Sequence, residues 1–255
     1  MTGSSGRFVL FDLDGTLVKP GSPLQRAHMD AMAAAIAAAT DNPETFVYRG
    51  GELFYREVNL AGFTDAGTVR AALVLAGLSD DEADLRLPRV IADMVERLGR
   101  VQFPRAGRAV DLLPGTREVL EGLCDAGIAL GMSTGNARAV ARWKMSAAGL
   151  SDLLHDGGFG DTAVHRDDVA RAGVAALATG GTPPRGVLVG DTVRDVTAAH
   201  AAGLPCLAVT TGAADAGELL AAGANAVLPG LSDRAVETLV RLCSQADALT
   251  HPNGS

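Results

Sequence analysis

Short apolar runs followed by amphipathic segments recur along the second half of the chain. Apolar runs occupy residues 128–134, 186–192 and 205–211, and helical patterns follow the first two at 136–150 and 194–203. Alternating strand and helix patterns favour a parallel sheet with helices on both faces. Glycines, which favour helix ends, stand where helices in this part of the chain are expected to stop: Gly127, Gly149 and Gly203.

Residues 20–106 show a different pattern. They contain no convincing strand, and the last of their helical patterns is expected to be interrupted at Pro88. These helices are predicted at 23–39, 66–78 and 79–98. Because an apolar strand pattern precedes this region, we predict an α/β core formed by residues 1–19 and 107–255. The core would be a doubly wound, Rossmann-like parallel sheet, and residues 20–106 would form a small α-helical cap domain inserted in it.

Composition narrows the class of protein. The chain has 255 residues, of which 47% are hydrophobic, and its formal net charge is −8. An acidic chain without a run of basic residues is unsuited to binding nucleic acid, so we expect no such partner.

No apolar run approaches about 18 residues and the start lacks a signal-peptide pattern, so we expect no membrane association and a cytoplasmic location. We expect a monomer or a homodimer. The cysteines follow no disulfide or zinc spacing and are expected to be reduced, buried and structural: Cys124, Cys206 and Cys243.

Polar side chains gather where three predicted strands end. In open parallel sheets, ligands bind beyond the carboxyl ends of the strands. Four carboxylates meeting there would repel one another, and a hard divalent cation with oxygen ligands, Mg²⁺, would relieve the repulsion. Lys144, on the helix after the second of these strands, would join Mg²⁺ in neutralising a bound phosphate. The strand-end residues are Asp12, Asp14, Ser133, Thr134 and Asp191, with Asp195 four residues further on.

The order of these motifs resembles that of the haloacid dehalogenase-like superfamily. D-x-D-G-T begins at Asp12, Thr134 ends a later strand, Lys144 lies on the next helix, and G-D-T-x-x-D spans 190–195. The stretches GMSTGN…WKMSAAGL and GDTVRDVTAAHAAG are similar to those of phosphoglycolate-phosphatase-type members. The resemblance covers the core, about two-thirds of the chain, and extends only loosely to the cap.

This resemblance implies a Mg²⁺-dependent phosphatase acting on a small phosphorylated metabolite through an aspartyl-phosphate. Asp12 would be the nucleophile. Asp14 would protonate the leaving oxygen and later activate water, and we expect neighbouring negative charge to raise its pKa. Phosphoryl oxygens would be bound by Thr134, Gly135 and Lys144, and Lys144 would also touch the nucleophile.

The resemblance also implies a metal site at the same strand ends. Mg²⁺ would be held by Asp12, the carbonyl of Asp14 and Asp191. Asp195 would support that site or orient Lys144. Two further residues would shape the turn after the first strand: Gly15 would permit it and Thr16 would brace it.

Three alternatives stay open. The stretch 131–135 matches the G-x-S-x-G elbow of serine esterases, but the downstream histidines, His200 and His251, are poor triad candidates. That interpretation also leaves Asp12 and Asp14 without a role. A phosphomutase would use the same core, and a module that binds a phosphorylated ligand without turnover is the third possibility.

The cap departs from the family pattern at one position. Phosphatases of this type often carry a basic residue in a G-[KR]-T-D loop, whereas this chain has Phe63 in A-G-F-T-D. The change favours a leaving group larger or less anionic than that of phosphoglycolate. The arginines that could compensate are Arg49, Arg56 and Arg70. The remaining histidines form no metal pair and are expected to be structural or exposed: His28, His155 and His165.

Overall fold

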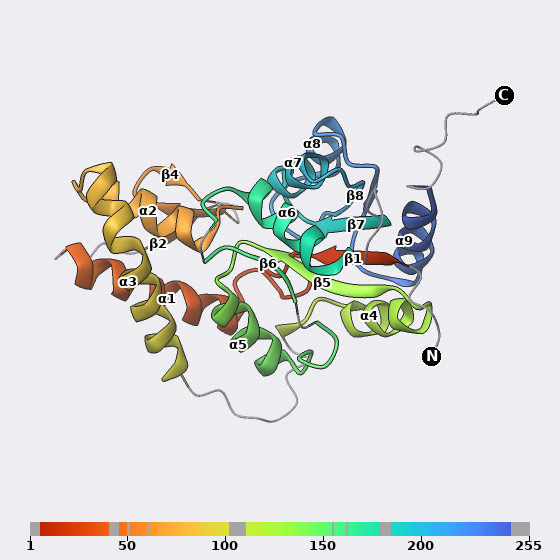
Figure 1. Cartoon of the computed structure of the whole chain (residues 1–255), viewed down its shortest axis with the longest axis horizontal. Helices are drawn as coiled ribbons and strands as arrows, with labels where there is room; N and C mark the ends of the chain where they lie inside the picture. The colour runs from red at the N-terminus through yellow and green to blue at the C-terminus, as the bar shows by residue number, and fades with distance from the viewer. Residues whose placement is uncertain are drawn as a thin grey trace.

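A parallel sheet forms the centre of the molecule. The computed structural model describes residues 6–40, 46–49, 52–60, 62–101, 111–154, 156–161, 163–178 and 185–245. Within these residues six parallel strands pair in the order β6-β5-β1-β7-β8-β9, which confirms the predicted parallel sheet (Figure 1). The strands are β1 (Arg7–Phe11), β5 (Ala129–Thr134), β6 (Gly157–Phe159), β7 (Arg185–Gly190), β8 (Cys206–Val209) and β9 (Ala226–Leu228).

Helices cover both faces of this sheet. Successive side chains of a strand point to opposite faces, so Val9 and Phe11 of β1 enter one hydrophobic cluster and Phe8 and Leu10 enter another. The first cluster is closed by α4 (Thr116–Asp125), α5 (Arg138–Ala148) and α9 (Asp233–Gln245). The second is closed by α6 (Arg166–Leu177), α7 (Val193–Ala201) and α8 (Ala216–Ala221). Burial on both faces explains the unbroken apolar run of β1.

The predicted helix ends are confirmed. Gly127, Gly149 and Gly203 have φ angles of 68°, 72° and 73°, and they directly follow the last turns of α4, α5 and α7. A left-handed residue at this position stops a helix and frees the chain to re-enter the sheet, and glycine adopts it without a steric penalty.

The described residues between 20 and 101 form a second layer of the molecule, which we call the insert. Its helices are α1 (Pro23–Thr40), α2 (Asp65–Leu75) and α3 (Asp80–Gly99), as predicted, and they share a separate hydrophobic cluster that includes Met32, Leu73 and Met94. Figure 1 shows the insert beside the end of the sheet at which α5 and α6 begin. The predicted boundary at residue 107 lies outside the described residues.

The insert also contains a small antiparallel sheet, so the prediction that it lacks strands was wrong. Its strands are too short to show a period of two in the sequence. They nevertheless pair closely, with Val47 opposite Phe54, and the rings of Phe46 and Tyr55 lie 5.2 Å apart between centroids. The strands are β2 (Phe46–Arg49), β3 (Glu52–Tyr55) and β4 (Val58–Asn59).

The predicted interruption at Pro88 was also wrong, because α3 runs through it. Proline removes one helical hydrogen bond and disfavours a helix interior. Two features of α3 offset that cost. Ser79 and Glu82 form a capping box at its start, and its buried face includes Val90 and Met94.

Two smaller expectations concern membranes and thiols. Among the helices of the described ranges, none has the length and apolar character needed to cross a bilayer. All three cysteines are free. Cys206 and Cys243 are buried as predicted, but the prediction of a buried Cys124 was wrong, because that side chain is exposed at the end of α4.

Candidate active site

The carboxyl ends of the three central strands deliver the predicted residues to one cavity. Asp12 follows β1, Gly135 follows β5 and Asp191 follows β7, and all three line a cavity of about 480 Å³. Asp14 lines it as well. The insert supplies much of the opposite wall, so the cavity lies between the two layers of the molecule.

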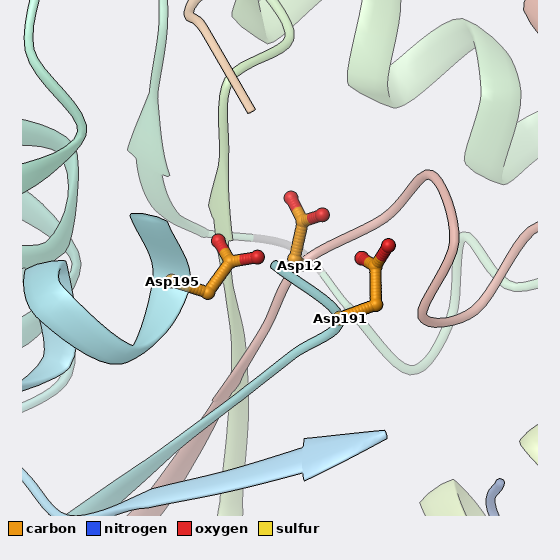
Figure 2. Close-up of side chains that lie close together, drawn as sticks. All are labelled: Asp12, Asp191 and Asp195. Carbon is orange, nitrogen blue, oxygen red and sulfur yellow. The ribbon is translucent and has the colours of Figure 1, made fainter. Parts of the chain in front are cut away.

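Three buried carboxylates crowd together at this edge of the sheet. Oxygens of Asp12, Asp191 and Asp195 lie within 4.8 Å of one another (Figure 2). Burial raises the pKa of Asp12 to about 7, and charge on Asp195 and Asp14 adds to the effect. Burial also holds the pKa of Asp191 well above its usual value, with charge on Asp12 acting in the same direction. Carboxylates that resist ionisation because they are buried and repel one another fit a site for a hard divalent cation.

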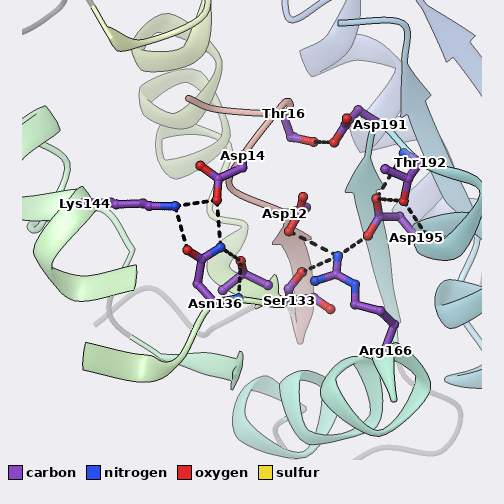
Figure 3. Close-up of polar contacts among 11 residues, drawn as sticks. Asp12, Asp14, Thr16, Ser133, Asn136, Lys144, Arg166, Asp191, Thr192 and Asp195 are labelled. Carbon is purple, nitrogen blue, oxygen red and sulfur yellow. Dashed lines mark hydrogen bonds and ion pairs between the residues drawn. The ribbon is translucent and has the colours of Figure 1, made fainter. Parts of the chain in front are cut away.

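Arg166 compensates part of this negative charge. Its guanidinium lies 3.1 Å from Asp12 Oδ1, contacts Asp195 and donates to the carbonyl of Ser133 (Figure 3). The side chain is buried, and the neighbouring carboxylates hold its pKa above the usual value. Sequence reasoning missed Arg166, whose only signal was a basic residue at the start of the helix between Lys144 and the G-D-T-x-x-D motif.

Asp195 is held by two partners. The backbone N–H and the hydroxyl of Thr192 donate to its Oδ2 at 3.1 and 2.7 Å, which caps the start of α7. Its other oxygen contacts Arg166. The structure therefore connects Asp195 to Asp12 through Arg166. Of its two expected roles, orienting Lys144 finds no contact among the described residues, whereas support of a metal site stays a prediction, because Asp195 lies close to Asp12 and Asp191.

A second cation, Lys144, pairs with Asp14 on the side of Asp12 opposite Arg166 (Figure 3). Lys144 Nζ is fully buried, 2.5 Å from Asp14 Oδ2 and 2.7 Å from Asn136 Oδ1. The amide nitrogen of Asn136 donates to the same Asp14 oxygen and to Thr134 Oγ1, both at 2.9 Å (Figure 3). Asn136 was not predicted, although it directly follows the strand-end Thr-Gly pair. It joins Lys144, Asp14 and Thr134 into one network.

This network overturns one expectation. Burial acts to raise the pKa of Asp14, but the charge and hydrogen bond of Lys144 outweigh it and hold that pKa below its usual value. We expected the opposite shift because we weighed only the neighbouring carboxylates. We also expected Lys144 to touch Asp12, but the cation that contacts Asp12 is Arg166.

The turn after β1 has the predicted form. Gly15 adopts a φ of 89°, and a β-carbon there would overlap the carboxylate of Asp191. Thr16 Oγ1 donates to Asp191 Oδ1 at 3.1 Å. Gly15 thus permits both the turn and the close approach of Asp191, and Thr16 fixes the orientation of that carboxylate.

Of the two neighbouring residues expected to bind phosphoryl oxygens, Gly135 lines the cavity and Thr134 is buried. Gly135 lines the cavity, and its carbonyl accepts a hydrogen bond from the N–H of Asp65 in the insert at 2.7 Å. Thr134 is fully buried and its hydroxyl accepts from Asn136. A hydrogen bond therefore joins the insert to the loop that follows β5 and contains Gly135.

The serine-esterase alternative gains no support from the geometry. Ser133 is buried, and no hydrogen bond in the described ranges joins it to a histidine. His200 is an exposed residue of α7. His251 lies outside the described residues.

The sequence was compared with known families and proteins. The model of the haloacid dehalogenase-like hydrolase family matches residues 7–203. A phosphoglycolate phosphatase of Agrobacterium fabrum is 30% identical over 210 residues, which is 81% of each chain. A plasmid phosphoglycolate phosphatase of Cupriavidus necator is 32% identical over 228 residues, covering 88% of this chain and 89% of that protein.

Solved structures share the fold at lower identity. A structure titled as a predicted phosphatase from Clostridium acetobutylicum matches with a TM-score of 0.64 and 19% identity, covering 92% of this chain and 99% of that one. A β-phosphoglucomutase from Clostridium difficile matches with a TM-score of 0.65 and 15% identity, covering 94% and 98%. At these identities the likeness concerns the arrangement of the chain alone.

Proposed function

The chain belongs to the haloacid dehalogenase-like hydrolase family and is a phosphoric monoester hydrolase, and from that premise we propose that it hydrolyses a small-molecule phosphate monoester through an aspartyl-phosphate on Asp12. The observation that carries the proposal is the position of Asp12. It lies at the carboxyl end of the central strand, facing the cavity, between Arg166 and the carboxylate of Asp191.

Asp12 has the placement a nucleophile needs. The backbone N–H of Asp12 donates to the carbonyl of Val189 at 2.8 Å, and Arg166 holds its carboxylate. One carboxylate oxygen would attack phosphorus, the ester oxygen would leave, and water would then hydrolyse the acyl phosphate to regenerate Asp12. Arg166 favours the ionised, reactive form of Asp12 against the effect of burial.

Asp14 would carry the proton in both steps. In the free protein Lys144 keeps Asp14 in its ionised form. A phosphate dianion arriving between Asp12 and Asp14 adds negative charge that opposes Lys144, so the pKa of Asp14 rises on binding. Asp14 would then donate a proton to the leaving oxygen and afterwards take one from the attacking water.

The loop after β5 would bind the phosphoryl oxygens. Gly135 and Asn136 line the cavity. Lys144 would supply a charge from behind Asp14, and Thr134 would hold the amide of Asn136 in position. Donors fixed in place before the substrate arrives need no reorganisation as charge develops.

Mg²⁺ would be held by Asp12, Asp191 and the backbone carbonyl of Asp14. The raised pKa values of Asp12 and Asp191 support this assignment, because a bound cation would let both carboxylates ionise. When bound, Mg²⁺ would neutralise these carboxylates and withdraw charge from the phosphoryl oxygens.

The test uses two aspartate variants with acetyl phosphate and Mg²⁺. Asp12→Asn should release no phosphate. Asp14→Asn should transfer the phosphoryl group to the protein but hydrolyse it slowly, so an acid-stable label accumulates on Asp12. Asp125→Asn, an exposed change at the end of α4, is the matched control and should behave like the unchanged protein. Full turnover by Asp12→Asn would refute the proposal. In a parallel assay of the unchanged protein with hexose phosphates, an isomerised sugar phosphate in place of free phosphate would indicate a mutase.

A further inference from the structure

The wall that the insert contributes to the cavity is largely apolar. Met29 and Met32 of α1 line it together with Leu60 and Phe63 from the segment before α2. Met29, Met32 and Leu60 are buried, at 8%, 1% and 3% exposure. Apolar side chains around a cavity favour a ligand with an apolar body of its own.

Phe63 connects this wall to the core. The guanidinium of Arg194, at the start of α7, lies 4.1 Å from the centre of the Phe63 ring, a cation–π contact between the core and the insert. Next to Phe63, the hydroxyl of Thr64 donates to the carbonyl of Val164 at 3.1 Å. Arg194 is not among the residues that line the cavity. Phe63 therefore lines the cavity, whereas the charge of Arg194 does not.

The polar part of the same wall carries a carboxylate. Asp65 is buried and lines the cavity, with Oδ2 3.1 Å from His28 Nε2 and accepting the N–H of Ala137 at 2.7 Å. His28 is 1% exposed, also lines the cavity, and its Nδ1 makes no hydrogen bond within the described residues. The wall thus offers His28 Nδ1 as a polar contact, while the adjacent Asp65 opposes a second anionic group.

The cations of the cavity do not change this balance. Arg166 is engaged by Asp12 and Asp195. Arg26 also lines the cavity, but its side chain is exposed and donates to the carbonyl of Gly21. A carboxylate placed against the buried wall would lose its hydration and lie near Asp65, while the buried cations described at the cavity, Arg166 and Lys144, are already paired with Asp12, Asp195 and Asp14.

We propose that this site selects phosphate monoesters of neutral alcohols with an apolar body, which packs against Phe63 and Met32, and discriminates against esters whose leaving group carries a carboxylate. The proposal rests on the proposed function, because the phosphoryl group must occupy the site at Asp12. It separates this chain from the phosphoglycolate phosphatases to which it is similar.

The test compares three esters that differ in one property at a time. 2-Phosphoglycolate and its amide have nearly the same size and differ in charge, and benzyl phosphate adds an apolar ring. With Mg²⁺ present, kcat/KM for the amide should exceed that for the acid at least tenfold, and benzyl phosphate should be the best of the three. Calorimetry on Asp12→Asn should give the same order of affinities, which separates binding from chemistry.

Variants of the wall connect the preference to Phe63. Phe63→Lys should raise kcat/KM for 2-phosphoglycolate about tenfold and lower it for benzyl phosphate. Phe63→Leu, which keeps the wall apolar, should leave the ratio of acid to amide unchanged. The control for the added charge is Leu85→Lys on α3, where the native side chain is 82% exposed and does not line the cavity. It should change none of the three values.

Each other outcome counts against one of the two proposals. A preference for 2-phosphoglycolate in the unchanged protein would overturn the assignment of the leaving group, and so would an unchanged ratio of acid to amide in Phe63→Lys. If acetyl phosphate is hydrolysed but benzyl phosphate is not, the phosphatase stands and the leaving-group assignment falls. If acetyl phosphate is also untouched, the proposed function fails and this inference falls with it.

Discussion

Lys144 Nζ lies 2.5 Å from Asp14 Oδ2 and is completely buried. The two residues are 130 positions apart in the chain and meet because α5 leads away from the strand next to β1. This pair supplies the acidic site with a cation on the side opposite Arg166.

Removing Lys144 should destabilise the protein. Lys144→Met leaves the largely buried Asp14 carboxylate without its cation, which typically costs about 3–5 kcal/mol of unfolding free energy. Adding Asp14→Asn to this variant should recover part of the loss, since no charge then stays unpaired. Urea denaturation at pH 7 measures both. Lys19→Met is the control, because Lys19 is exposed and its loss should change stability by less than about 0.5 kcal/mol. Equal losses in the two single variants would contradict the pairing.

Arg166 should affect both stability and turnover. Arg166→Met leaves Asp12 and Asp195 facing each other without compensation, and we expect a loss of about 3–5 kcal/mol together with a large fall in kcat. Arg166→Lys should restore part of kcat, because it keeps the charge without the planar fork. The comparison is Arg171→Met on the same helix, where an exposed ion pair to Asp168 is lost and less than about 1 kcal/mol is expected. If Arg166→Met kept normal kcat, Arg166 would not position Asp12.

The stability of the metal-free protein should fall as pH rises from about 4 to about 7. Asp12 has a native pKa of about 7, above the roughly 3.9 of an unfolded chain, so the native state binds more protons across this interval. The linked loss is at most roughly 4 kcal/mol. Asp191 acts in the same direction. The depressed pKa of Asp14 has the opposite sign and acts in a separate window, because its stabilisation is present above about pH 4 and lost as the solution becomes more acidic.

The measurement is urea denaturation in EDTA at pH 5 and pH 7.5. Mg²⁺ should remove the decline, since a cation that binds only the native state stabilises it most where the carboxylates are ionised. Asp12→Asn should flatten the dependence without metal. A stability in EDTA that rises over this interval would show that the crowded carboxylates do not dominate.

The close approach of Asp191 to the turn should make Gly15 sensitive to substitution. Gly15→Ala introduces a left-handed alanine, costing about 1–2 kcal/mol, and also a β-carbon that overlaps Asp191. Gly21 shares the backbone conformation, with φ at 65°, but a β-carbon there meets nothing within 4 Å. Gly21→Ala should therefore cost only the free energy of placing alanine in the left-handed conformation. The difference in unfolding free energy between Gly15→Ala and Gly21→Ala then measures the overlap with Asp191. Equal costs would mean that Asp191 shifts aside freely.

The sequence was most informative where the strand pattern or the local backbone determines the position of a residue. Asp12 and Asp191 could be predicted to meet because apolar runs identify strands, and parallel strands bring their carboxyl ends to one edge. The turn at Gly15 followed from local backbone chemistry. These inferences need no knowledge of how helices cross the sheet.

The contacts made by side chains on helices could not be predicted in the same way. Which carboxylate Lys144 meets depends on where α5 lies over the sheet, and that depends on its packing, including that against α1 and α3 of the insert, rather than on spacing. Arg166 was hidden for a related reason, because an arginine at the start of a helix is unremarkable until α6 places it beside Asp12. The shift in the pKa of Asp14 followed from the same missed pairing.

The central place of β1 in the sheet has a consequence for biosynthesis. β1 leaves the ribosome well before its neighbours, which are β5, beginning at Ala129, and β7, beginning at Arg185. At typical rates of translation, roughly 10 to 35 s pass before β7 is made. During that time the nascent chain carries an apolar segment with both edges unpaired, a species prone to aggregation. The insert is completed earlier, and its hydrophobic cluster is separate from those of β1, so the partners that cover β1 still have to come from the later core helices.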